Sequence, residues 1–79
     1  MKKKSIEVIG WYGAAAILLA YVLVSLEVIS SKSLVFQFLN LTGAASIVAV
    51  SLSKKDYQPA VLNIVWAGVA LVAVVALLL

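Results

Sequence analysis

The polar side chains in this sequence that could do chemistry are mostly uncharged amides set in apolar surroundings. In the stretch FQFLNLTGAAS, Gln37 and Asn40 lie three residues apart in an otherwise largely apolar run. Asn63 follows in VLNIVWAGVA, about one helical turn before Trp66. Amides donate and accept hydrogen bonds but do not titrate, so they can bind a polar solute or pair helices, and they cannot carry a proton.

Groups suited to acid–base or metal chemistry are scarce. The chain has no histidine and no cysteine, which removes the commonest general base, the commonest metal ligand and any thiol chemistry. Its only acids are Glu7, Glu27 and Asp56, which lie near the ends of apolar stretches and form no spaced carboxylate pair. We therefore expect no catalytic residue, no metal site and no cofactor, and interpret the protein as not being an enzyme.

Three apolar stretches must position the amides, at about residues 7–29, 34–52 and 59–79. The chain is 66% hydrophobic, well above the roughly 45–50% of soluble domains. Each stretch approaches the ~20 residues that a helix needs to cross a bilayer, and none alternates like a strand. Short polar connections make successive helices antiparallel neighbours. The sequence predicts one all-α domain over residues 1–79, with three antiparallel transmembrane helices.

Residues near the ends of these stretches mark helix starts. Ser5 precedes the first helix, Ser31 or Ser33 can cap the second, and Asp56 can cap the third. Pro59 then falls in the first turn of the third helix, where its missing N–H costs little.

The charges indicate topology. The net charge is +3, and the lysines lie at segment ends rather than along one helix face with aromatics, which argues against nucleic acid as a partner. Five lysines would share one side of the membrane and only Lys32 the other; the five are Lys2, Lys3, Lys4, Lys54 and Lys55. This bias predicts a cytoplasmic N-terminus and contact with the lipid bilayer.

Small residues recur on one face of each stretch. Those predicted to pack helices are Gly13, Ala16, Ala20, Gly43, Ala44, Ala67 and Ala70. Small side chains let helix backbones approach closely, which drives association inside a membrane. We expect self-association through the Gly43, Ala44 and Ile47 side of the second helix or the Ala67 and Ala70 side of the third.

The polar side chains fall at two depths when helix rise is counted at ~1.5 Å per residue. The outer level holds Tyr21, Ser25, Gln37 and Asn40, and the inner level holds Asn63, Ser46 and Tyr12, with Trp66 one turn deeper. We expect a direct contact between Tyr21 and Asn40. Each amide can form a structural hydrogen bond between helices or contact a substrate. Trp66 can pack against neighbouring helices or stack on a ligand.

The motifs LLAY, LNLTGAA and KKDYQPAVLNIVWAGVAL resemble those of a family of small, uncharacterised bacterial inner-membrane proteins. This resemblance implies three helices and a place in the bacterial inner (plasma) membrane. The chain is more distantly similar to the SemiSWEET sugar transporters, three-helix chains that pair into a transporter and hold sugar with a tryptophan and an asparagine. Asn63 corresponds loosely to that asparagine, whereas the first helix lacks the proline of that family.

Two functions fit these observations. The first is a structural or accessory membrane protein that acts by helix–helix association, as a homo-oligomer or within a larger membrane complex. The second is a minimal SemiSWEET-like transporter of a small polar solute, built from two or more copies. They differ in whether Gln37, Asn40 and Asn63 line a wet cavity or are buried against another helix.

Overall fold

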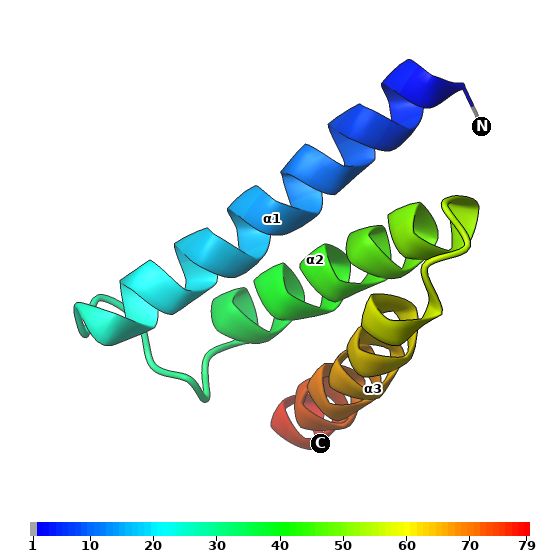
Figure 1. Cartoon of the computed structure of the whole chain (residues 1–79). Helices are drawn as coiled ribbons and strands as arrows, with labels where there is room; N and C mark the ends of the chain where they lie inside the picture. The colour runs from blue at the N-terminus through cyan, green and yellow to red at the C-terminus, as the bar shows by residue number, and fades with distance from the viewer. Residues whose placement is uncertain (1) are drawn as a thin grey trace.

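The computed structural model describes residues 2–79 and contains three helices, α1 (Lys3–Ser25), α2 (Leu34–Ser53) and α3 (Tyr57–Leu78). Successive helices run in opposite directions. The N-terminus and the α2–α3 connection lie at one end of the molecule, and the C-terminus lies at the other end (Figure 1). All three are long and apolar enough to cross a membrane. The predicted all-α membrane fold is confirmed.

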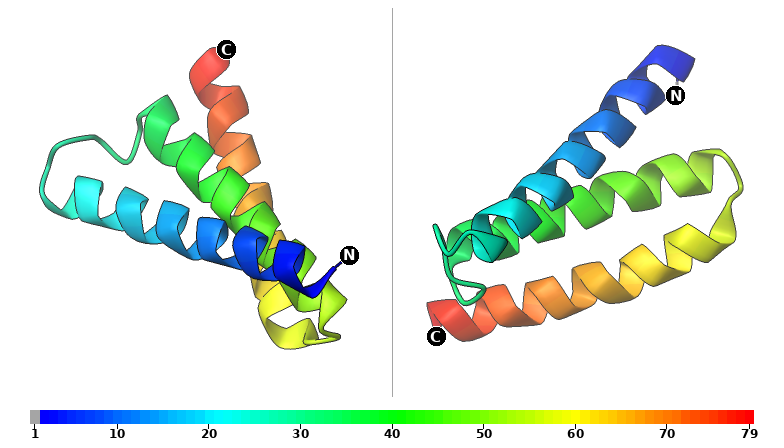
Figure 2. Two further views of the ribbon diagram at one scale, coloured as in Figure 1. Left: turned by 90° about the horizontal axis from the view of Figure 1, so that it is seen from above. Right: turned by 60° about the vertical axis from the view of Figure 1, so that its left-hand side comes forward.

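Helix α2 is the centre of the molecule. Both α1 and α3 pack on it, while α1 and α3 do not approach one another within the described chain. Figure 2 shows the two outer helices leaving α2 in different directions. The fold is therefore two helix pairs that share one member.

Helix α1 begins and ends earlier than the predicted range of 7–29. It ends because Glu27 adopts a left-handed conformation, with φ of 60°. The Val28 N–H then bonds to the Leu23 carbonyl at 2.9 Å and the Glu27 N–H to the Val24 carbonyl at 3.0 Å. These two bonds form a Schellman motif, which satisfies the last carbonyls and redirects the chain.

The end of α2 repeats this motif. Lys55 has a φ of 57°, the Asp56 N–H bonds to the Ser51 carbonyl at 2.8 Å, and the Lys55 N–H bonds to the Leu52 carbonyl at 3.1 Å. Both helices thus end at a left-handed residue, a position that glycine usually occupies, and here that residue is Glu27 or Lys55.

Replacing Glu27 by glycine should raise the free energy of unfolding by ~0.5–1 kcal/mol, because glycine adopts the left-handed conformation without a steric cost. Glu27→Ala is the matched control, since it removes the same charge and keeps the cost. Unfolding in mixed micelles by increasing amounts of a denaturing detergent measures both. Equal stability of the two variants would contradict the prediction.

The N-terminal caps agree only in part with the sequence. Ser33 caps α2, accepting a hydrogen bond from the Phe36 N–H at 3.2 Å. Ser5 lies inside α1, whose N-cap is Lys2, so the predicted cap is wrong. Asp56 occupies the N-cap position of α3 but its side chain accepts no capping bond. Its carboxylate is exposed, and water can solvate the first N–H groups of α3 at this end.

The helix interfaces are built from small side chains. The buried residues are Gly13, Ala16, Ala20, Gly43, Ala44, Ser51, Ala60, Ala70 and Val74. No large side chain in residues 2–79 is fully buried. Close backbone contact therefore holds the pairs together, as is typical in membranes.

Gly13 and Gly43 mark the closest approach of α1 and α2. A Cβ atom added to Gly13 would lie 2.9 Å from the Gly43 carbonyl oxygen, and one added to Gly43 would lie 2.7 Å from Cγ1 of Ile17. Gly43 and Ala44 are thus covered within the chain. Gly43 packs against α1, so this side of α2 serves contacts within the chain, and the expected self-association stays a prediction.

Candidate functional site

Three of the predicted polar and aromatic residues meet in one small cavity between α2 and α3. Gln37 and Asn40 come from α2, and Trp66 comes from α3. The cavity has a volume of about 130 Å³, and its remaining lining is Phe36, Val69 and Ala70. The helix pair thus combines two amides and an indole with an apolar wall.

The amides differ in their hydrogen bonds. Gln37 Nε2 donates to the Ser31 carbonyl at 2.8 Å, which ties the start of α2 to the first connection. Asn63 Nδ2 donates to the Pro59 carbonyl at 2.9 Å, within its own helix. Over residues 2–79 the Asn40 amide has no hydrogen bond, and it is half-buried in the cavity wall. Asn40 is therefore free to bind a group from outside the chain.

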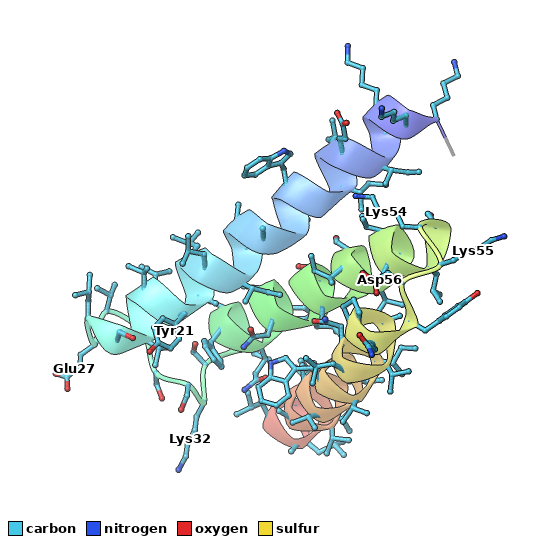
Figure 3. All side chains as sticks on the ribbon, in the orientation of Figure 1. Tyr21, Glu27, Lys32, Lys54, Lys55 and Asp56 are labelled. Atoms are coloured by element: carbon cyan, nitrogen blue, oxygen red, sulfur yellow. The ribbon has the colours of Figure 1, made fainter. Side chains whose placement is uncertain are left out.

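The hydrogen bond expected between Tyr21 and Asn40 is not formed. Tyr21 is 70% exposed, and Asn40 lines the cavity on the α3 side of α2. Figure 3 shows Tyr21 near the end of α1, and Ser25 beyond it is exposed as well. The predicted outer level is thus not gathered in one place: Gln37 and Asn40 line the cavity together with Trp66, whereas Tyr21 and Ser25 lie outside it.

Tyr12 makes the polar contact between α1 and α2 instead. Its hydroxyl lies 2.8 Å from Thr42 Oγ1. Because the Thr42 hydroxyl donates to the Phe38 carbonyl at 2.8 Å, the Tyr12 hydroxyl donates to Thr42. Tyr12 and Tyr21 are nine residues apart, which at 3.6 residues per turn places them on opposite sides of α1. Depth in the membrane alone did not show which of the two tyrosines faces α2, although their spacing along the helix could have shown that they face opposite ways.

Removing the Tyr12 hydroxyl with Tyr12→Phe should lower the free energy of unfolding by ~0.6 kcal/mol, the average for a hydrogen bond between membrane helices. Tyr21→Phe removes a hydroxyl that has no partner among residues 2–79 and should have no effect. Detergent-induced unfolding measures both. A loss of equal size in the two variants would show that the Tyr12–Thr42 bond contributes nothing specific.

The remaining predicted residues have structural surroundings. Ser46 donates to the Thr42 carbonyl at 2.9 Å, inside α2. Ala67 is half-buried, unlike the other residues predicted to pack helices, which are buried. Glu27 and Lys32 are both exposed on the first connection and point apart in Figure 3.

The cavity is suited to binding rather than to acid–base chemistry. Glu7, Glu27 and Asp56 are all exposed and none lines it. Residues 2–79 hold no group of three His, Cys, Asp or Glu side chains that could bind a metal ion. The cavity offers amide hydrogen bonds and an indole, in a volume below the roughly 300–1,000 Å³ of ligand pockets.

Comparison with known proteins gives a family and no individual relative. No curated protein and no solved structure matches the chain. The model of one family matches residues 6–79, and the family is uncharacterised. With this match over nearly the whole sequence, and three helices apolar enough to cross a membrane, the chain belongs to that family.

Proposed function

We propose that the protein is a multi-pass membrane protein of structural or accessory type, which acts by association of its helices. A second copy of the chain docks at the α2–α3 cavity. The Asn40 amide carries this proposal, because it lines the cavity without a hydrogen bond inside residues 2–79. An amide without a partner in hydrocarbon costs several kcal/mol, and a polar group from another helix removes that cost.

A second copy is a suitable occupant because identical chains insert to the same depth. Each copy presents Gln37, Asn40 and Trp66 at one level, and an amide both donates and accepts hydrogen bonds. Trp66 remains 53% exposed beside the cavity, so an incoming helix would find an apolar face next to the amide. A homo-oligomer therefore satisfies Asn40 without any other protein, while docking on a larger complex is the competing outcome.

The absence of cysteine makes a direct test possible, because each introduced cysteine is the only one. Val69→Cys places a thiol on the cavity wall, and Leu18→Cys places one on the exposed surface of α1. In membranes, Val69→Cys should form a disulfide-linked dimer on mild oxidation and Leu18→Cys should not. If neither variant crosslinks, or if both do equally, docking of a second copy at the cavity is refuted.

A minimal transporter is the second candidate, favoured by the meeting of Gln37, Asn40 and Trp66 in one cavity. Two amides and an indole are suited to holding a small polar solute such as a sugar, with the cavity completed by a second copy. With Trp11→Phe, Trp66 becomes the only tryptophan. A change in its fluorescence on titration with monosaccharides would support this candidate, and a flat response would reject sugar as its solute.

The orientation is part of the proposal. Five of the six lysines lie at the end of the molecule that holds the N-terminus and the α2–α3 connection, so the positive-inside rule places this end in the cytoplasm of a bacterial cell. A reporter active only outside the plasma membrane should give signal when fused to the C-terminus. Signal from the N-terminal fusion alone would reverse the orientation.

A further inference from the structure

The lysine-rich end of the molecule carries a groove that neither candidate function uses. It lies between the first half of α1 and the last turns of α2, away from the α2–α3 cavity. Its volume is about 290 Å³. The groove opens here because α1 and α2, tightest at Gly13 and Gly43, separate toward the N-terminal end of α1 (Figure 1).

The floor of the groove is apolar and narrow. Gly10 and Ala14 lie one turn apart along α1, and Val50 of α2 forms the opposite wall. A Cβ atom added to Gly10 would lie 3.5 Å from Cγ2 of Val50, an ordinary van der Waals distance, so α1 and α2 touch here and the missing side chain leaves a shallow track along their joint surface. An acyl chain that runs down from the membrane surface can lie along this track, on top of the two helices.

The rim of the groove is polar and aromatic. Trp11 lines it and is 76% exposed, and indole rings favour the headgroup level of a bilayer. Lys54 and Glu7 line it as well. Figure 3 shows the Lys54 side chain directed into the space between α1 and α2, whereas Lys55 points away from both helices. One lysine and one glutamate thus line the same opening.

We infer that this groove binds one anionic phospholipid whose headgroup carries hydroxyls, such as a phosphatidylglycerol. The Lys54 ammonium holds the phosphate, the Glu7 carboxylate accepts a hydrogen bond from a headgroup hydroxyl, and an acyl chain follows Gly10 and Ala14. Charge favours this occupant, because this end of the molecule has five lysines and only two acids, Glu7 and Asp56. Basic residues beside a membrane attract anionic lipids.

The test uses Trp11 as its reporter. In a Trp66→Phe background Trp11 is the only tryptophan, and lipids brominated on the acyl chain quench an indole that they contact. In phosphatidylcholine vesicles, brominated phosphatidylglycerol should quench Trp11 at a lower mole fraction than brominated phosphatidylcholine. Lys54→Gln should reduce this preference about fivefold, the effect of ~1 kcal/mol per lysine. Lys55→Gln makes the same charge change outside the groove and should reduce it much less.

The floor is tested separately. Gly10→Leu fills the track and should abolish the preference while leaving all charges in place. Gly68→Leu is its control, because Gly68 has no neighbour within 4 Å of an added Cβ. Equal losses for Lys54→Gln and Lys55→Gln would show only diffuse attraction to lysines, and no preference for phosphatidylglycerol in the parent would show no binding. Either result overturns the site. Both leaflets contain the lipid, so the test is independent of orientation.

Discussion

Replacing Gly43 by isoleucine is expected to separate α1 from α2 and to lower the free energy of unfolding by ~3 kcal/mol or more. The new Cβ alone would lie 2.7 Å from Cγ1 of Ile17 and 3.1 Å from the Gly13 carbonyl oxygen. A backbone carbonyl cannot move aside like a flexible side chain. The helices must therefore part, which removes the close packing on which membrane helices depend.

Alanine substitutions make this prediction quantitative. Gly13→Ala would set a Cβ 2.9 Å from the Gly43 carbonyl oxygen and should cost ~1–3 kcal/mol. Gly68→Ala meets no atom within 4 Å and should be neutral, or stabilising by up to ~1 kcal/mol through helix propensity. Unfolding in mixed micelles compares the variants. If Gly13→Ala and Gly68→Ala behave alike, the close approach of α1 and α2 is not a source of stability.

Replacing Asn40 by leucine should leave the folded chain intact and weaken its self-association ~5- to 30-fold. The fold is spared because Asn40 makes no hydrogen bond within residues 2–79. Association suffers because polar contacts between membrane helices contribute ~1–2 kcal/mol in model peptides. Energy transfer between labelled copies, measured as the protein is diluted into increasing amounts of lipid, gives the change in dissociation constant.

Asn63→Leu is the matched control for Asn40. Its amide is used within α3, by the bond to the Pro59 carbonyl, so this variant should lose no association. An Asn40→Leu protein that associates as well as its parent would refute the role proposed for the amide. If the parent is a monomer at every dilution, docking of a second copy is refuted and a partner of another kind must satisfy Asn40.

The three helices were predictable because the apolar runs that indicate them are local in the sequence. The two ends of α1 were not predictable in this way. A run of about 20 apolar residues indicates a membrane helix whatever surrounds it. The end of α1 was placed near Ile29, although the chain leaves the helix at Leu26. Glycine is the usual mark of such an end, and here Glu27 takes the left-handed position without it. Val28 and Ile29 continue the apolar run beyond the last helical residue, so composition alone did not indicate where α1 ends.

The candidate site was predictable residue by residue but not as an arrangement. Spacing along α2 places Gln37 and Asn40 on one side, and depth indicated that Trp66 was too deep for the membrane surface. Neither shows which neighbour covers that side. The prediction paired Asn40 with Tyr21 of α1, whereas α3 covers it and brings Trp66. Whether α1 or α3 covers Asn40 depends on how both helices pack on α2. The periodicity of α2 alone carries no information about that packing.

The central place of α2 has a consequence for the order of folding. Every helix pair joins neighbours in sequence, so the α1–α2 hairpin can close without α3. Short-range contacts of this kind form quickly because little chain entropy is lost. Trp66 arrives with α3, and only then does Asn40 gain its cavity. A chain truncated before α3 would thus keep the glycine-based hairpin and lack the cavity.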